Sequence, residues 1–267
     1  MKLKQKKDFQ RFAEKLATQA GEIIMRYFDT EITKRLKEGE EVVTIADEKI
    51  NNMVIKEVER TYPTHSVLGE EASNDKQSDL VWVCDPIDGT IPFTQGVPVS
   101  TFSLALVEDG MPIVGVVYDP YTKRLYSGAK ELGAHVNSKR LQVSDRKLNN
   151  KQTTIDVEWW PQAEFNLGLF AYNLAMETGA YVPVLGSTVN ASCYVGYGTY
   201  EACLFAGSKG KCVDIAAIKI LVEEAGGKVT DLFGNEQRYD QDIKGAIVSN
   251  GVIHDEIVRR LKPYLSK

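Results

Sequence analysis

Several residues and patterns that often carry function are scarce in this chain. Its 267 residues include three histidines and four cysteines, and the cysteines form no C-x-x-C pair. We therefore expect reduced, buried thiols and neither a zinc site nor a disulfide framework. No stretch approaches the roughly 18 uninterrupted apolar residues of a membrane span. The charged start "MKLKQKKDFQRF" has no apolar run behind it, which argues against a signal peptide.

Positive charge is not in excess either. Lysine and arginine number 32 against 37 aspartates and glutamates, which gives a formal net charge of −5. Without a basic surface, nucleic acid and anionic membranes are not expected partners. The hydrophobic content of 43% is ordinary for a folded protein. The sequence therefore predicts a soluble cytoplasmic protein that would bind an anion through a cation or through backbone amides.

The first half of the chain has clear helix and strand patterns. Apolar residues at three-and-four spacing predict amphipathic helices over 8–27 and 44–60. The run "LVWVC" (80–84) reads as a buried strand that Pro86 should end. A hairpin is expected over 100–120, with its turn at 108–110, and further short strands follow it.

The second half is expected to begin after the polar residues 149–151, which divide the chain into segments 1–150 and 151–267. Its expected strands cover 153–159 and 180–187, and its expected helices cover 167–177, 189–197 and 214–227.

The stretch "DPIDGTIPFTQG" (85–96) is the first candidate site. Taken alone it is explained by an ordinary polar turn after a strand. An Asp-x-x-Asp turn can also hold the carboxylates of Asp85 and Asp88 and the carbonyl of Ile87 on one side. Gly89 then lets the backbone approach a ligand, at a helix start whose free amides would bind phosphate.

Distant carboxylates decide between these alternatives. Glu70 follows a short strand and could be a solvated loop charge, and Asp214 opens the predicted helix of 214–227 and would make a good N-cap. Together with Asp85 and Asp88 they form a set of hard oxygen ligands of the kind that Mg²⁺ prefers. A carboxylate shared by two ions would make a two-metal site.

Six separated motifs carry a family resemblance. They are "VVTIAD" (42–47), "LGEE" (68–71), "WVCDPIDGT" (82–90), "GVVYDP" (115–120), "ELGAHVNSKRLQVS" (131–144) and "VDIAAIKILVEEAGG" (213–227). In this order and at these separations they resemble the inositol monophosphatase family, whose members are Mg²⁺-dependent, lithium-sensitive phosphomonoesterases related to fructose-1,6-bisphosphatase.

The resemblance implies a fold and an assembly. We expect an α+β protein, a layered αβαβα sandwich in two lobes with the metal site between them. Residues 1–150 would form an N-terminal lobe with most metal ligands, and residues 151–267 a C-terminal lobe that supplies Asp214 and the substrate-side loop. A homodimer is implied as well.

The resemblance also implies the metal ligands. Glu70, Asp85 and the Ile87 carbonyl would hold one Mg²⁺. A second ion would be held by Asp85, Asp88 and Asp214. Glu70, which we also count among the catalytic residues, would support a weaker third ion through water, and Mn²⁺ could replace Mg²⁺. The implied reaction is in-line attack of water on a phosphomonoester of a small alcohol or sugar, with the metal lowering the pKa of the water.

Further roles follow from the same motifs. Asp47 and Thr90 resemble the pair that orients the attacking water, although an acid in the first turn of a helix is also favoured by the helix dipole. Gly89 and Thr90 would bind phosphate. Ser187 and Thr188 lie where the family places small residues beside the substrate.

Departures from the family pattern bear on the substrate. Pro92 replaces the usual Asn, and Ile91 replaces the Lys that is typical of the 3′-phosphoadenosine-phosphate nucleotidases. Val213 replaces the usual Trp before Asp214. Inositol-selective enzymes have a Glu about seven residues before that Asp, where this chain has Gly207.

Two features stay outside the motifs. Lys209 and Lys211 are read as solvated charges or as contacts for a more anionic substrate, and Trp159-Trp160 as a core or subunit contact. The sequence thus leaves open fructose-1,6-bisphosphatase, histidinol-phosphate phosphatase and nucleotidase activity, and, as the least favoured alternative, a catalytically silent binding protein.

Overall fold

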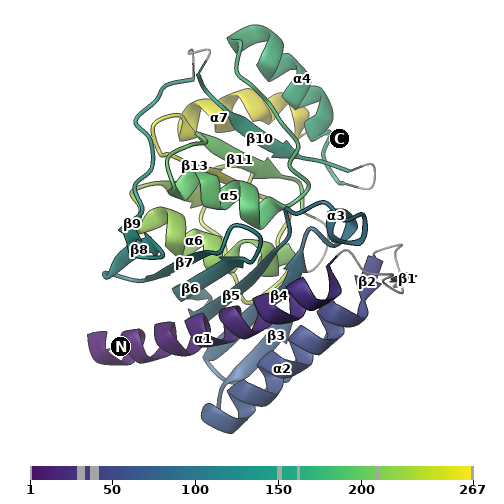
Figure 1. Cartoon of the computed structure of the whole chain (residues 1–267). Coiled ribbons are helices and arrows are strands. Elements are labelled where there is room, and N and C mark those ends of the chain that lie inside the picture. The colour runs from purple at the N-terminus through teal and green to yellow at the C-terminus, as the bar shows by residue number, and fades with distance from the viewer. Residues whose placement is uncertain are drawn as a thin grey trace.

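The computed structural model describes residues 2–28, 34–36, 42–148, 152–160, 163–207 and 211–265. In this part of the chain, helices and sheets alternate in five layers, which confirms the expected α+β sandwich (Figure 1). The first layer is α1 (Leu3–Tyr27) and α2 (Ile45–Thr61), and the middle layer is α5 (Thr188–Gly196) and α6 (Ala216–Glu223). Helices α4 (Leu167–Thr178) and α7 (His254–Leu261) form the last layer.

Two sheets separate these helical layers. The larger has the strand order β3-β4-β5-β6-β7-β8-β9, and only β3 and β4 in it pair in parallel. Its strands are β3 (Ser66–Gly69), β4 (Leu80–Asp88), β5 (Thr101–Glu108), β6 (Met111–Asp119), β7 (Arg124–Ala129), β8 (Gly133–Val136) and β9 (Lys139–Arg140). The smaller has the order β10-β11-β13-β12, and its strands are β10 (Ile155–Glu158), β11 (Ala202–Phe205), β12 (Lys228–Thr230) and β13 (Ala246–Ser249). A separate antiparallel pair joins β1 (Lys34–Leu36) and β2 (Val42–Thr44).

Local patterns explain where the first helices lie. The apolar stripe of α1 is buried, from Phe9 through Leu16 to Ile24, so the helix predicted over 8–27 is confirmed. The helix predicted over 44–60 is confirmed as α2, with Thr44 as its N-cap. Both helices pack on the outer face of the larger sheet, because their apolar sides and that face form one core.

The predicted hairpin is confirmed in β5 and β6. Its two-residue turn is Asp109 at φ 52° and Gly110 at φ 84°. Left-handed values at both positions are what a tight turn between two twisted strands needs, and Asp-Gly supplies them at little cost. The helices predicted over 167–177 and 189–197 are confirmed as α4 and α5.

Two sequence expectations are wrong. Pro86 does not end the strand that precedes it: β4 continues to Asp88, with a register shift against β5 between Asp85 and Asp88. A bulge accommodates proline because it leaves ladder positions unpaired. Residues 180–187 form no strand, only an isolated bridge at Tyr181, and Pro183 has no N–H to continue a ladder.

The cores join the two halves of the chain. The central core contains residues of both sheets and of α5 and α6, such as Val117, Val195 and Val248. The division at residue 150 therefore stays a prediction, and residues 149–151 themselves lie outside the described part of the chain. All four cysteines are free and buried, as expected. Among the described helices, none is long and apolar enough to cross a membrane.

Candidate active site

Three carboxylates meet where the two halves of the sequence come together. Asp85 and Asp88 lie at the end of β4, and Asp214 lies at the end of the 3-10 turn η1 (Lys211–Asp214). One oxygen of each lies within 4.8 Å of the others, and all three residues are buried. Three like charges at this separation repel strongly away from water. The group therefore fits a divalent cation, whose preferred ligands are carboxylate oxygens.

The end of β4 is shaped to present these groups. The amide of Ile87 donates to Asp85 Oδ1 at 3.0 Å, and the hydroxyl of Thr90 donates to the Ile87 carbonyl at 3.0 Å. Both bonds lie within or next to the bulge that contains Pro86. A carbonyl oxygen has a second lone pair. The Ile87 carbonyl can therefore still accept another partner.

Asp214 does not cap the helix that follows it, so the N-cap alternative is wrong. Helix α6 begins at Ala216, with Ile215 in the N-cap position and no side-chain cap. The turn η1 comes first, and the carboxylate of Asp214 belongs to the three-carboxylate group instead. The usual Trp position, Val213, is a buried core residue.

Residues at the start of α5 hold the carboxylate of Asp88. Its Oδ2 accepts hydrogen bonds from the hydroxyl of Ser187 and, at 3.0 Å, from the amide of Val189. Burial raises the pKa of Asp88 well above its usual range, the charge of Asp214 raises it further, and the two hydrogen bonds oppose this. A carboxyl with a raised pKa is costly to ionise unless a cation is near. The hydroxyl of Ser187, predicted to contact substrate, is thus bonded to Asp88.

Glu70 lies beside this group without belonging to it. Its amide donates to the Cys84 carbonyl at 3.1 Å, which places it next to the last residues of β4. It is half-buried, and its negative charge raises the pKa of Asp47. The structure therefore brings Asp85, Asp88 and Asp214 together as ligand atoms, with Glu70 and Asp47 as neighbours of each other.

Asp47 is held rigidly at the start of α2. Its Oδ2 accepts from the amide of Thr44 at 3.0 Å and from the Thr44 hydroxyl, in a capping box. The other oxygen, Oδ1, is buried and has no hydrogen-bond partner among the described residues. Burial raises the pKa of Asp47 to about 7, with help from Glu70 and against the hydrogen bonds of Thr44. A buried acceptor without a partner indicates a place for water or a cation.

The turn after Asp88 is tightly packed. Gly89 has φ +82° and is the N-cap of α3 (Thr90–Thr94), the short helix that the sequence predicted there. A Cβ at Gly89 would lie 3.0 Å from the carbonyl oxygen of Gly186 and 3.2 Å from the Cβ of Ser187. The two turns therefore lie against each other, and only glycine fits both the space and the backbone conformation. Thr188 follows Ser187 as a buried residue.

Residues that bear on the substrate lie as follows. Ile91 is exposed at the start of α3. A Cβ at Gly207 would lie 2.6 Å from the amide nitrogen of Gly245, so this position has no room for the acid of inositol-selective enzymes. Trp159 is half-exposed against Gly168, and Trp160 packs on the central core. Lys209 and the side chain of Lys211 lie outside what the structure describes.

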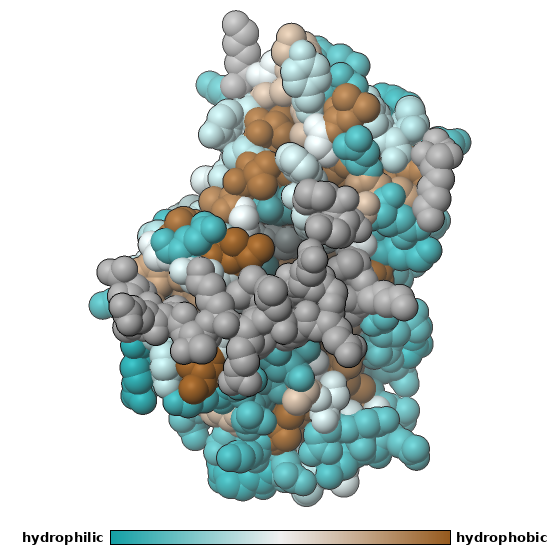
Figure 2. All heavy atoms as spheres, turned by 90° about the vertical axis from the view of Figure 1, so that its right-hand side faces the viewer, coloured by the Kyte–Doolittle hydropathy of each residue, from teal (hydrophilic) through white to brown (hydrophobic). Residues whose placement is uncertain are grey.

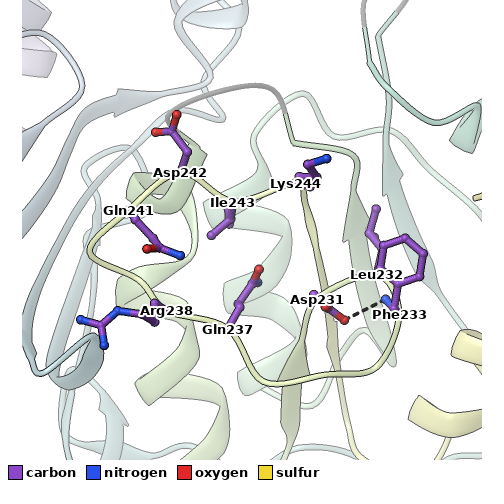
Figure 3. A pocket seen from close by; sticks show the side chains of 9 residues that line it. All are labelled: Asp231, Leu232, Phe233, Gln237, Arg238, Gln241, Asp242, Ile243 and Lys244. Atoms are coloured by element: carbon purple, nitrogen blue, oxygen red, sulfur yellow. Dashed lines mark hydrogen bonds between the residues drawn. The ribbon is translucent and has the colours of Figure 1, made fainter.

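A pocket of about 190 Å³ lies elsewhere, between residues 231–233 and 237–244 (Figure 3). Its guanidinium, Arg238, is paired with Asp240 at 2.5 Å, and Asp231 accepts from the amide of Phe233 at 2.8 Å. None of the predicted site residues lines this pocket. We therefore place the candidate active site at the carboxylates.

The sequence reasoning missed two buried acids next to this site, Asp156 and Glu158 of β10. They accept hydrogen bonds from the amides of Leu185 and Gly186, directly before Ser187. The available signal was their spacing: acids two residues apart lie on one face of a strand, between the apolar Ile155 and Val157. Such a pattern in a buried strand indicates a structural or functional role.

Comparisons with known proteins agree with this geometry. The model of the inositol monophosphatase family matches residues 5–266. A fructose-1,6-bisphosphatase/inositol-1-monophosphatase of Thermotoga maritima is 33% identical over 249 residues, which cover 93% of each chain. A Nus factor SuhB of Pasteurella multocida is 30% identical over 262 residues, 95% of this chain and 96% of that protein.

Solved structures lead to the same family. An inositol monophosphatase of Thermotoga maritima superposes with a TM-score of 0.87 at 31% identity, covering 97% of this chain and 98% of that one. An inositol monophosphatase/NADP phosphatase solved with Mg²⁺ and phosphate gives a TM-score of 0.82 at 25% identity, with 96% of both chains covered. This chain therefore belongs to the inositol monophosphatase family and is a phosphomonoesterase.

Proposed function

We propose that the chain is a Mg²⁺-dependent hydrolase of a small polyol or sugar phosphate. The observation that carries this proposal is the group of three buried carboxylates, Asp85, Asp88 and Asp214, with oxygens within 4.8 Å of one another. The family membership gives the reaction class. The choice of Mg²⁺, with Mn²⁺ as a substitute, rests on the all-oxygen ligand set and on the related phosphatase that was solved with Mg²⁺ and phosphate.

The residues divide into two overlapping ligand sets. Asp85, Asp88 and Asp214 would hold one ion, and Glu70, Asp85 and the Ile87 carbonyl a second, with Glu70 supporting a weaker third. The lone pair that the Ile87 carbonyl keeps beside its bond from Thr90 supports this assignment. Bound Mg²⁺ supplies Lewis-acid chemistry, because it lowers the pKa of a water molecule and offsets negative charge on the leaving group.

Asp47 and Thr90 would orient the attacking water. Within the part of the chain that the structure describes, Asp47 Oδ1 has no hydrogen-bond partner, so it can accept a hydrogen bond from a water molecule. The Thr90 hydroxyl donates its own proton to the Ile87 carbonyl, so its oxygen can accept a hydrogen bond from the second proton of the water molecule. A water molecule that donates both protons presents a lone pair to phosphorus. Little acid–base work is left for the protein, in agreement with the scarcity of histidines.

Backbone and small side chains would hold the substrate. The amides of Gly89 and Thr90 would bind the phosphate, because the left-handed Gly89 opens the turn towards a ligand. Thr188 and Ser187 would border the alcohol part, with the Ser187 hydroxyl acting through Asp88. Position 207 has no room for an acidic side chain, so we do not expect the enzyme to be selective for inositol 1-phosphate. Fructose 1,6-bisphosphate is therefore kept as a candidate substrate, and the name of the Thermotoga maritima relative, a fructose-1,6-bisphosphatase/inositol-1-monophosphatase, supports this choice.

Assembly and location belong to the same proposal. Helix α4 exposes three apolar side chains on one face, Leu169, Tyr172 and Met176. Figure 2, which faces the side where α4 lies in Figure 1, has apolar surface in its upper half. This supports a homodimer through the last helical layer. The four buried free thiols support a cytoplasmic protein. Sensitivity to Li⁺ and the two-lobe division are proposed from the family.

A phosphate-release panel tests the proposal. It compares inositol 1-phosphate, fructose 1,6-bisphosphate, histidinol phosphate and adenosine 3′,5′-bisphosphate, each with Mg²⁺ and with chelator. Asp88→Asn should abolish release. Asp231→Asn should retain phosphate release. The carboxylate of Asp231 also accepts hydrogen bonds from backbone amides, but it lies outside the site. If no ester is hydrolysed, the alternative of a silent binding protein is favoured, and if Asp88→Asn keeps full activity, the proposed metal-dependent mechanism is wrong.

A further inference from the structure

We propose that Asp156 and Glu158 are positioning residues of the active site, with Glu158 as the ionised acceptor that fixes the turn of residues 185–187. This turn in turn holds Asp88. The inference rests on the proposed function, because it assigns a task within the same metal site. It concerns neither a metal ligand nor a residue that touches the substrate.

The two acids occupy an unusual place. They alternate along β10, so both point to the same side of the smaller sheet, and both are buried. Their neighbours Ile155 and Val157 point to the other side, into the core with α4 and α7. Burying a carboxyl costs several kcal/mol unless it is well hydrogen-bonded. A strand packed on both faces would be more stable with apolar residues there, so the acids need another explanation.

Their hydrogen bonds converge on one short turn. Asp156 Oδ2 accepts from the amide of Leu185 at 3.0 Å, and Glu158 Oε1 accepts from the amide of Gly186 at 2.6 Å. Burial raises the pKa of Glu158, and the amides of Gly186, Ser187 and Leu185 oppose this by hydrogen bonding. Two successive amides therefore donate to the two carboxyl groups, which attach the turn to β10 at Leu185 and Gly186.

The two carboxyl groups also bond to each other. Burial raises the pKa of Asp156, and the charge of Glu158 raises it further. The side chains share a hydrogen bond, which two ionised carboxylates cannot make. The bond that Glu158 accepts from the turn is the shorter one, 2.6 Å against 3.0 Å for Asp156, as expected for a charged acceptor, so we assign the proton to Asp156. This arrangement leaves a single negative charge, which the amides of the turn surround.

The far side of the turn reaches the active site. Ser187 is the N-cap of α5, and its hydroxyl donates to Asp88 Oδ2, to which Val189 also donates through its amide. The carbonyl of Gly186 fills the space that a side chain at Gly89 would occupy. The position of Asp88 and of the proposed phosphate turn thus depends on where residues 185–187 are held. Glu158 also lies close enough to Asp88 for its charge to raise the Asp88 pKa.

Three variants test this assignment. Glu158→Gln keeps the size of the side chain and removes its charge. Asp156→Asn mimics the protonated acid, because its amide group can donate to Glu158 and its oxygen can accept from Leu185. Glu201→Gln is the matched control: Glu201 is equally buried and accepts from the amide of Thr154 at 2.6 Å, but it pairs with Arg146 instead of the turn.

The first readout is the affinity for Mn²⁺ alone, measured by titration calorimetry without substrate. Glu158→Gln should weaken it about 10–100-fold, as is typical for residues that support metal ligands. Asp156→Asn and Glu201→Gln should keep the wild-type affinity. The positioning role of Glu158 is overturned if Glu158→Gln binds Mn²⁺ like the wild type or if Glu201→Gln loses as much affinity. An equal loss in Asp156→Asn would overturn the assignment of the proton to Asp156.

The second readout does not depend on the metal. Hydrogen exchange of the amides of residues 185–189 in the metal-free protein should become faster in Glu158→Gln and stay unchanged in Glu201→Gln. Unchanged exchange in Glu158→Gln would also overturn the inference. A wild-type protein that binds Mn²⁺ but hydrolyses no phosphate ester would refute the proposed function alone, because these two measurements would still show whether the turn is held by Glu158.

Discussion

The hydroxyl of Ser187 donates a hydrogen bond to Oδ2 of Asp88, across 99 residues of sequence. This contact joins the N-terminus of α5 in the middle layer to the end of β4 in the larger sheet. The same hydroxyl accepts from the amide of Asn190 at 3.3 Å, so it caps the helix while it orients the carboxylate. One side chain therefore couples the folding of α5 to the geometry of the proposed metal site.

Replacing Ser187 should lower both the stability of the fold and the affinity for a divalent cation. For Ser187→Ala we expect a loss of about 1 kcal/mol in the free energy of unfolding, from the lost cap. The affinity for Mg²⁺ should fall about 10–100-fold, because Asp88 loses a hydrogen bond that fixes its orientation. Chemical denaturation and calorimetry measure the two effects.

The control is Asn166→Ala, which removes the N-cap of α4, a helix of the opposite outer layer. It should cost a similar stability and leave Mg²⁺ affinity intact. Equal loss of Mg²⁺ affinity in both variants would mean that Ser187 acts only through stability.

Site residues that lie close together in the sequence were the easiest to predict. Asp85, Asp88 and Gly89 lie within five residues, and their motif was readable in the sequence. The helices over 8–27 and 44–60 were equally readable, because the periodicity of an amphipathic helix repeats within a few residues.

Contacts between distant residues outside the motifs were not readable. Asp156 and Glu158 find their partners 29 and 28 residues later, in a turn that no pattern marked. Asp214 was readable as a partner of Asp85 and Asp88 only through the separated motifs, because by local rules alone an acid there would cap a helix. Pro86 was expected to end its strand, but a bulge carried the pairing past it. In each case tertiary contacts outweighed a local preference.

Divalent cations should stabilise the fold. Burial and the charge of Asp214 make the ionised form of Asp88 unfavourable without a cation. A cation that binds these carboxylates only in the folded state therefore raises stability by mass action. At 100 times the dissociation constant, Mg²⁺ should add about 2.7 kcal/mol, or roughly 5–10 °C in the melting temperature. Thermal unfolding with Mg²⁺ and with chelator measures this. The shift should be much smaller in Asp214→Asn, and a full shift in that variant would contradict the proposed ligand set.

Gly186 should be essential for activity and not only for stability. Its φ is +82°, and a Cβ there would lie 3.0 Å from the Cγ of Pro92, beside the proposed phosphate turn. We expect Gly186→Ala to lose about 1–2 kcal/mol of stability through backbone strain and to lose most of its turnover. Stability and phosphate-release assays on one preparation separate the two losses.

Gly251→Ala provides the comparison. Its φ is +79°, but a Cβ there would have its nearest neighbour at 3.7 Å, the carbonyl oxygen of Gly226. The backbone strain is therefore similar without the steric contact. This variant should lose stability and keep turnover. If both variants turn over normally, the packing between Gly186 and Pro92 has no part in catalysis.

His254 should make stability depend on pH at the other end of the molecule. Its ring is buried, with Thr230 Oγ1 at 2.9 Å and Ser249 Oγ at 2.8 Å, and burial together with the charge of Lys228 lowers its pKa from 6.5 to about 4. Because the folded state disfavours the charged ring, its contribution is complete above pH 6.5 and is lost as the pH falls towards 4.

Between about pH 7.5 and pH 5 this loss amounts to roughly 2 kcal/mol for the wild type. His254→Asn should be less stable at neutral pH but should lack this part of the pH dependence. Denaturant titrations of both proteins across this pH range, in the presence of a chelator, give the free energy of unfolding of each. Subtracting the two pH profiles removes the contribution of the buried carboxyls, because these titrate in both proteins. Parallel curves would mean that the ring is protonated equally easily in the folded and unfolded chains, and that its two hydroxyl partners do not hold it neutral.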